Sequence, residues 1–145
     1  MKKIQLLTFI TVAMIAAASA FAEDIAPGLW EITLESQVPT DTGWAPAPFN
    51  LTQCVTTSDA KDPSALISSI AVPGATGCNY TDRSYSGSTF RFTLECAGSY
   101  GIKARGSVTF SSNSFNGSIT ATTNIVDGQT TEFQNRLSAK RVGGC

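Results

Sequence analysis

The four cysteines, Cys54, Cys78, Cys96 and Cys145, are the residues of this chain whose chemistry is easiest to predict. The closest two, Cys78 and Cys96, are 96 − 78 = 18 positions apart. Zinc sites are typically built from cysteine pairs only a few residues apart, so this spacing does not favour a metal. An even number of widely spaced cysteines is typical of disulfides in an oxidising compartment. We therefore predict two structural disulfides and no metal site.

Groups that could support catalysis are few. The chain has no histidine, which excludes Ser-His and Cys-His pairs and imidazole ligands. Glu31 and Glu35 lie four residues apart on one face of a predicted strand, about 13 Å by strand rise. That separation is larger than the two carboxylates of a glycosidase require. We predict that the protein is not an enzyme and needs no cofactor.

The amino-terminal segment 1–22 has the pattern of a secretory signal peptide. Lys2 and Lys3 precede an apolar run over residues 4–17, and Ala20-Phe21-Ala22 provides small residues for cleavage. We predict cleavage after Ala22, with cleavage after Ala20 as the alternative. Residues 23–145 would then form one domain without a membrane span, in the periplasm or secreted.

The charge of this predicted domain does not favour nucleic acid as a partner. Removing Lys2 and Lys3 leaves 10 − 2 = 8 basic residues against 11 acidic ones, a net charge of −3. The sequence also contains no basic cluster of the kind that neutralises phosphates.

Alternation of apolar and polar residues predicts an all-β domain. Residues 78–142 read as five consecutive antiparallel strands separated by Gly, Ser, Asn or Asp turns, and residues 29–38 and 49–56 read as two earlier strands. Asp62-Pro63 marks the start of one short helix. The predicted fold is an up-and-down meander of about seven strands that forms a small barrel or half-barrel. A β-sandwich is the alternative.

The positions of two cysteines relative to the intervening turn predict the disulfide pairing. Cys78 and Cys96 are equidistant from Gly87, so a hairpin folded there places the two residues directly opposite. The second bridge then joins Cys54 to Cys145. Of the three pairings that four cysteines allow, only this one follows from strand register.

The same arithmetic gives expected registers for the later hairpins. A turn at Ser112-Asn113 pairs Phe110 with Phe115. A three-residue loop centred on Gly98 pairs Leu94 with Ile102. An odd-length loop centred on Gly128 keeps the apolar faces in phase and sets Phe133 opposite Thr123 and Leu137 opposite Ile119.

The inner face of the predicted sheet mixes large aromatic residues with glycines and alanines. One interpretation is that large and small side chains interlock and fill a narrow barrel. The other is an apolar cavity for a lipid-like or aromatic ligand, with residues 39–48 and the short helix as lids. The candidate ligand or rim contacts are Trp44, Trp30, Phe90, Phe92, Phe110, Phe115 and Phe133.

The run Pro27-Gly28-Leu29-Trp30-Glu31 resembles the Gly-Leu-Trp-Glu signature of a bacterial secreted family, domain of unknown function three-six-one-seven. The likeness continues through Cys54-Val55-Thr56, the two mid-chain cysteines, Phe115-Asn116-Gly117 and the closing Arg141-Val142-Gly143-Gly144-Cys145. The resemblance implies a periplasmic or envelope protein of a Gram-negative bacterium. It implies no activity, ligand or catalytic residue.

These observations favour a non-catalytic binding or interaction module. One alternative is a carrier of an apolar small molecule or lipid, which requires a cavity inside the sheet. Another is an inhibitor of a cell-wall enzyme, whose partner would be an envelope protein.

Overall fold

The computed structural model describes residues 25–38, 46–98, 101–125 and 129–145 of the chain. The predicted signal segment 1–22, with its two cleavage points, lies outside the described residues. So do Trp44 and most of the predicted lid, residues 39–45.

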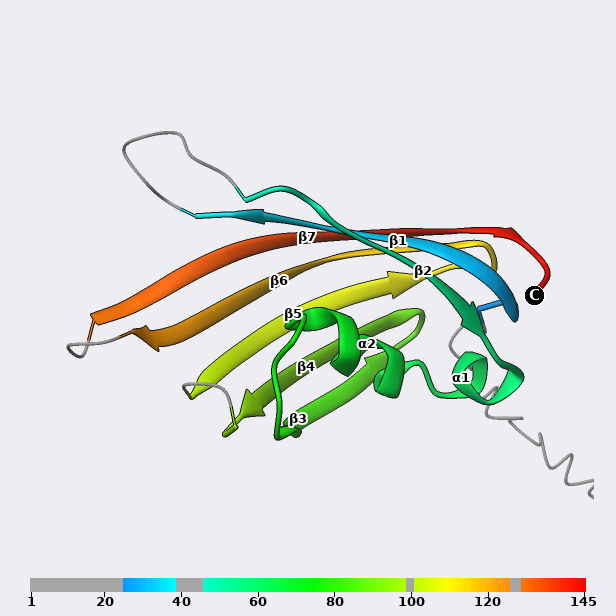
Figure 1. Cartoon of the computed structure of the whole chain (residues 1–145). Coiled ribbons are helices and arrows are strands. Elements are labelled where there is room, and N and C mark those ends of the chain that lie inside the picture. The colour runs from blue at the N-terminus through cyan, green and yellow to red at the C-terminus, as the bar shows by residue number, and fades with distance from the viewer. Residues whose placement is uncertain (1–24, 39–45, 99–100, 126–128) are drawn as a thin grey trace, which may run out of the picture.

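The seven strands form one antiparallel sheet in the order β2-β1-β7-β6-β5-β4-β3. The sheet curves around one face, and its edge strands β2 and β3 do not pair with each other (Figure 1). The predicted meander is therefore confirmed, and the structure is a half-barrel rather than a closed barrel or a sandwich. The strands are β1 (Gly28–Gln37), β2 (Phe49–Val55), β3 (Cys78–Ser86), β4 (Thr89–Cys96), β5 (Ile102–Phe110), β6 (Ser114–Ile125) and β7 (Gln129–Gly143).

Two short helices connect β2 to β3, where the sequence predicted one. The predicted helix is α2 (Ser64–Ala71), which begins one residue later than expected, with Pro63 rather than Asp62 as its N-cap residue. The additional helix is α1 (Thr57–Lys61), which begins with a capping box between Thr56 and Asp59. A helix of five residues is too short to show a periodic apolar pattern, which is why the sequence analysis missed it.

The core lies between the concave face of the sheet and α2 (Figure 1). Trp30, Ile32 and Leu34 alternate into it from β1, as predicted. Large and small residues interlock in the middle of the sheet, where Phe92 lies opposite Gly106. A Cβ atom at Gly106 would lie 2.6 Å from Cζ of Phe92, so the phenyl ring occupies the space that a side chain would take.

Both predicted disulfides are present. Cys78 lies directly opposite Cys96, and a second bridge joins Cys54 to Cys145. The turn between β3 and β4 contains Gly87 and Ser88 rather than the symmetrical three residues expected. A register shift between Tyr80 and Asp82 compensates for the shorter turn and restores the pairing of the cysteines.

The register of the later hairpins was predicted with mixed success. Phe110 pairs with Phe115 as expected. Leu94, however, pairs with Ala104 rather than Ile102. Phe133 pairs with Ala121 rather than Thr123.

Leu137 likewise pairs with Gly117 rather than with Ile119. The wrong registers differ from the observed ones by two residues, so every side chain keeps its predicted face. Alternation fixes the face of a residue, but the length and centre of the turn fix its partner.

The hairpin disulfide provides a test of the pairing. We expect Cys78→Ala and Cys96→Ala to lower the free energy of unfolding by similar amounts, about 3 kcal/mol in the chain-entropy model. The double variant should lose little more than either single variant, because each single change already opens the same loop. Urea unfolding of the three variants measures this, and additive losses would contradict a shared bridge.

Candidate functional site

A cavity of about 160 Å³ lies at one end of the half-barrel. The sheet forms one wall, and the end of α2 with the residues that follow it forms the other. The sheet contributes Leu34 and Ser36 from β1, Phe49 from β2, Ile102 from β5, Ala121 and Thr123 from β6, and Phe133 and Asn135 from β7. The opposite wall consists of Ala71, Val72 and Pro73, with Ala47 beside Phe49.

The size and lining of this cavity suit a small apolar group. Among the described residues that line it, only Ser36, Thr123 and Asn135 are polar. An apolar cavity of roughly 150 Å³ is large enough to bind benzene. Phe49 is 41% exposed, so the cavity reaches the protein surface there. One aromatic ring or the end of an alkyl chain therefore fits inside, and a larger ligand can extend into solvent.

Asn135 is a polar residue in an apolar surrounding. The residue is 8% exposed and lies on the inner face of β7, between Phe133 and Leu137. Ile119 lies opposite on β6, and Ser36 lies opposite on β1. Among the residues that the structure describes, no hydrogen-bond donor reaches Oδ1 of Asn135. An unsatisfied buried acceptor of this kind costs about 1–3 kcal/mol of stability.

Polar contacts hold α2 in place against the sheet. Ser64 donates from its backbone N and its Oγ to Oδ1 of Asp62, at 3.2 and 2.6 Å. The hydroxyl of Tyr80 donates to the carbonyl oxygen of Ser64 at 2.5 Å. The hydroxyl of Tyr85 donates to Oδ1 of Asp62 at 3.3 Å. These contacts join the start of α2 to β3 and so fix the position of the cavity wall at its other end.

The protonation states of Asp62, Tyr80 and Tyr85 agree with their roles as hydrogen-bond acceptor and donors. The hydrogen bond from the Ser64 hydroxyl holds the pKa of Asp62 below its usual value, so its carboxylate remains an acceptor at neutral pH. Burial raises the pKa of Tyr85 to about 12 and raises that of Tyr80 as well. Both phenols therefore remain hydrogen-bond donors at neutral pH.

Most of the predicted contact residues do not line the cavity. Phe133 lines it, whereas the other five described residues of that set lie in the packed core. Trp30 is fully buried, stacks on Phe115 with ring centroids 5.3 Å apart, and donates Nε1–H to the carbonyl oxygen of Ala26. Trp44 lies outside the described residues. Contact between Phe133 and a ligand remains a prediction.

Most of the cavity wall was not predicted from the sequence, although the position of Asn135 could have been noticed there. The inner face of β7 reads Phe133, Asn135, Leu137, Ala139, so Asn135 interrupts an otherwise apolar alternation. A polar residue at a core position is informative, because it must find a partner or reduce stability. The residues that follow α2 carried no such signal, since their approach to the sheet depends on the tertiary fold.

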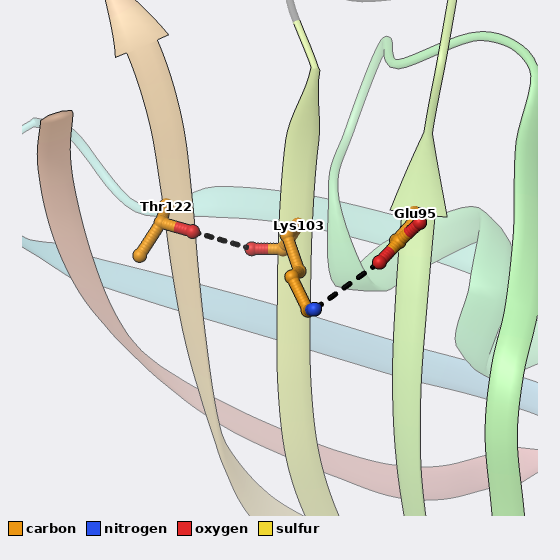
Figure 2. A network of polar contacts seen from close by, with 3 residues as sticks. All are labelled: Glu95, Lys103 and Thr122. Carbon is orange, nitrogen blue, oxygen red and sulfur yellow. Dashed lines mark hydrogen bonds and ion pairs between the residues drawn. The ribbon is translucent and has the colours of Figure 1, made fainter.

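The outer face of the sheet is polar and contains a different kind of hollow. Figure 2 shows Lys103 between Glu95, whose Oε1 lies 3.1 Å from Nζ, and Thr122, whose Oγ1 donates to the Lys103 carbonyl oxygen. Arg105 and several threonines line the hollow beside Lys103. The ion pair is half-exposed, so it contributes at most about 1 kcal/mol. The described residues that line this hollow are all polar or charged, so it does not suit an apolar group.

The described ranges contain neither a metal-binding cluster nor a membrane-spanning helix. No group of three or more Cys, Asp or Glu side chains there is arranged to hold a metal ion. In the same ranges, no helix has the length and apolar character needed to cross a bilayer.

The residues that carry the family resemblance join the two ends of the domain. Gly28 has φ +146°, and a Cβ atom there would lie 2.4 Å from the carbonyl oxygen of Gly143 and 2.5 Å from Nε of Arg141. Nε of Arg141 donates to the carbonyl oxygen of Pro27 at 2.8 Å. Gly28 is therefore the residue that allows β1 to approach the end of β7, and these contacts support the fold rather than the cavity.

Comparison with known proteins identifies the family. The family model described as Protein of unknown function (DUF3617) matches residues 25–145, so the chain belongs to this family, as the sequence resemblance predicted. No curated protein and no solved structure matches the chain significantly.

The close approach at Gly28 can be tested by substitution. We expect Gly28→Ala to destabilise the protein by about 1–3 kcal/mol, because the methyl group would clash and the backbone conformation is accessible essentially only to glycine. Gly144→Ala is the matched control, since nothing lies within 4 Å of a Cβ atom there. Equal stabilities of the two variants in thermal unfolding would contradict the role assigned to Gly28.

Proposed function

We propose that this member of the family is a non-catalytic binding protein whose half-barrel holds the apolar part of a small molecule. The observation that carries the proposal is the apolar cavity between the end of the sheet and the end of α2. Ligand sites are typically concave and apolar, with a small number of polar groups that orient the ligand. The cavity has this composition.

The walls of the cavity belong to well-packed elements, which favours a preformed site. Leu34, Ala71 and Ala121 line the cavity, and each is 5% exposed or less. They belong to the same apolar core as α2 and the middle of the sheet. A site with fixed walls loses little conformational entropy on binding, so even a small ligand can be held.

The polar groups of the cavity support binding rather than catalysis. Asn135, Ser36 and Thr123 contribute an amide and two hydroxyls. The described lining includes no carboxylate, amine, thiol or phenol that could transfer a proton or act as an activated nucleophile at neutral pH. These groups can orient a ligand by hydrogen bonds.

The proposed location is the periplasm or the extracellular space. Two disulfides favour an oxidising compartment. The pattern of residues 1–22 favours export, and the family resemblance favours a bacterial envelope.

Export can be checked by intact mass. When the full chain is expressed in a Gram-negative host, we expect protein released from the periplasm to have the mass of residues 23–145 less four hydrogens. Cleavage after Ala20 would add two residues to this mass. Recovery of the whole chain with four reduced thiols from the cytoplasm would contradict the proposed location.

Ligand binding can be tested with toluene, which is small enough for the cavity. In NMR titrations of the mature chain, we expect saturable shifts of the methyl signals of Leu34, Ile102 and Ala121. Ala121→Leu should weaken toluene binding by at least about tenfold, because the larger side chain occupies the cavity. A tenfold loss corresponds to about 1.4 kcal/mol.

Ala139→Leu is the matched control for this experiment. Ala139 lies on the inner face of β7, pairs with Ile32 and Phe115, and does not line the cavity. Toluene should bind this variant as it binds the wild type. The proposal is wrong if toluene causes no saturable shifts, or if both leucine variants bind it equally well.

A further inference from the structure

We propose that the ligand of this cavity carries a hydroxyl group and that the side-chain amide of Asn135 is its hydrogen-bond partner. The inference rests on the proposed binding function and specifies the ligand class as a neutral alcohol or phenol with an apolar body.

The position of Asn135 supports a role in ligand recognition. The residue lines the cavity although it is more than nine-tenths buried, and its Oδ1 has no partner within the described part of the protein. Its neighbours on the inner face of β7, Phe133 and Leu137, are apolar. If this position served only to pack the core, an apolar residue there would give a more stable protein.

The chemistry of the amide selects the class of the ligand group. An amide presents an acceptor at one end and two donors at the other, and rotation about χ2 exchanges two ends of similar size. A hydroxyl both donates and accepts, so it can pair with whichever end faces the cavity. A carboxylate can only accept, and none of the described lining residues is a cation that could balance its charge. The site therefore favours a neutral hydroxyl over an acid.

Other lining residues fit the remainder of such a ligand. Leu34, Ala121 and Phe133 surround the apolar space next to Asn135. Ser36 also lines the cavity and lies directly opposite Asn135 across the β1–β7 pair. Asn135 and Ser36 thus lie together on one side of the cavity, where a single hydroxyl can lie while a ring or an alkyl chain fills the apolar side. Thr123 lies farther along β6, opposite Thr131.

Phenol and toluene form a matched pair of probes, because they differ by a hydroxyl in place of a methyl group. We expect Asn135→Leu to weaken phenol binding by at least about tenfold and to leave toluene binding unchanged or tighter. The ratio of the two dissociation constants would then change by about tenfold or more. Asn116→Leu, on the exposed outer face of β6, should leave this ratio as in the wild type.

The stability of the unliganded variant provides an independent readout. Asn135→Leu removes a buried oxygen without a partner, so we expect its melting temperature to rise by a few degrees. A purely structural asparagine would instead be needed for stability, and its loss would lower the melting temperature. In the wild type, the side-chain amide signals of Asn135 should shift with phenol and much less with toluene, which gives a measurement that does not require the variant to fold.

The outcomes separate this inference from the proposed function. If both probes bind but Asn135→Leu leaves their ratio unchanged, or if the Asn135 amide signals respond equally to both, the hydroxyl assignment is wrong and the binding function stands. If neither probe binds the wild type, both proposals are wrong.

Discussion

An open sheet that curves around an apolar face must cover that face with something other than its own strands. Here the edge strands β2 and β3 remain unpaired with each other, and α2 covers part of the concave face between them. Because α2 has only eight residues, it covers only part of the sheet. The cavity lies where this cover ends, between the residues that follow α2 and the ends of β1, β6 and β7. The length of one short helix therefore decides where apolar surface is left for a ligand.

The opposite end of the half-barrel is closed by packing and by one disulfide. Trp30 stacks on Phe115, Gly28 allows the close approach of β1 to the end of β7, and Cys54 is bridged to Cys145. In the chain-entropy model this long-range bridge contributes about 4–5 kcal/mol. The second bridge, Cys78–Cys96, lies at the cavity end, because Cys96 pairs with Ile102 of the cavity lining. A bridge at each end helps the fold to tolerate a destabilising group in the ligand site, the unpaired oxygen of Asn135.

The family signature and the candidate site lie in different parts of the molecule. The residues that carry the resemblance, Gly28 and Trp30 among them, have structural roles at the closed end. Residues of the cavity wall such as Ala71 and Ala121 belong to no signature and are chemically ordinary. The motif that identifies the family therefore points to the scaffold, and the candidate site becomes visible only when the strands and α2 are assembled.

The sequence alone determined the properties that depend on local periodicity and on counting. Alternation placed Trp30, Ile32 and Leu34 on the inner face, and symmetry about Gly87 paired Cys78 with Cys96. The symmetry held only because a register shift between Tyr80 and Asp82 offsets a turn that is one residue shorter than expected. The tertiary structure decided what periodicity leaves open. A shift of two residues keeps every side chain on its face, so the pairing of Phe133 with Ala121 depended on the turn. The cavity depended on how far α2 reaches across the sheet, a distance that no local pattern encodes.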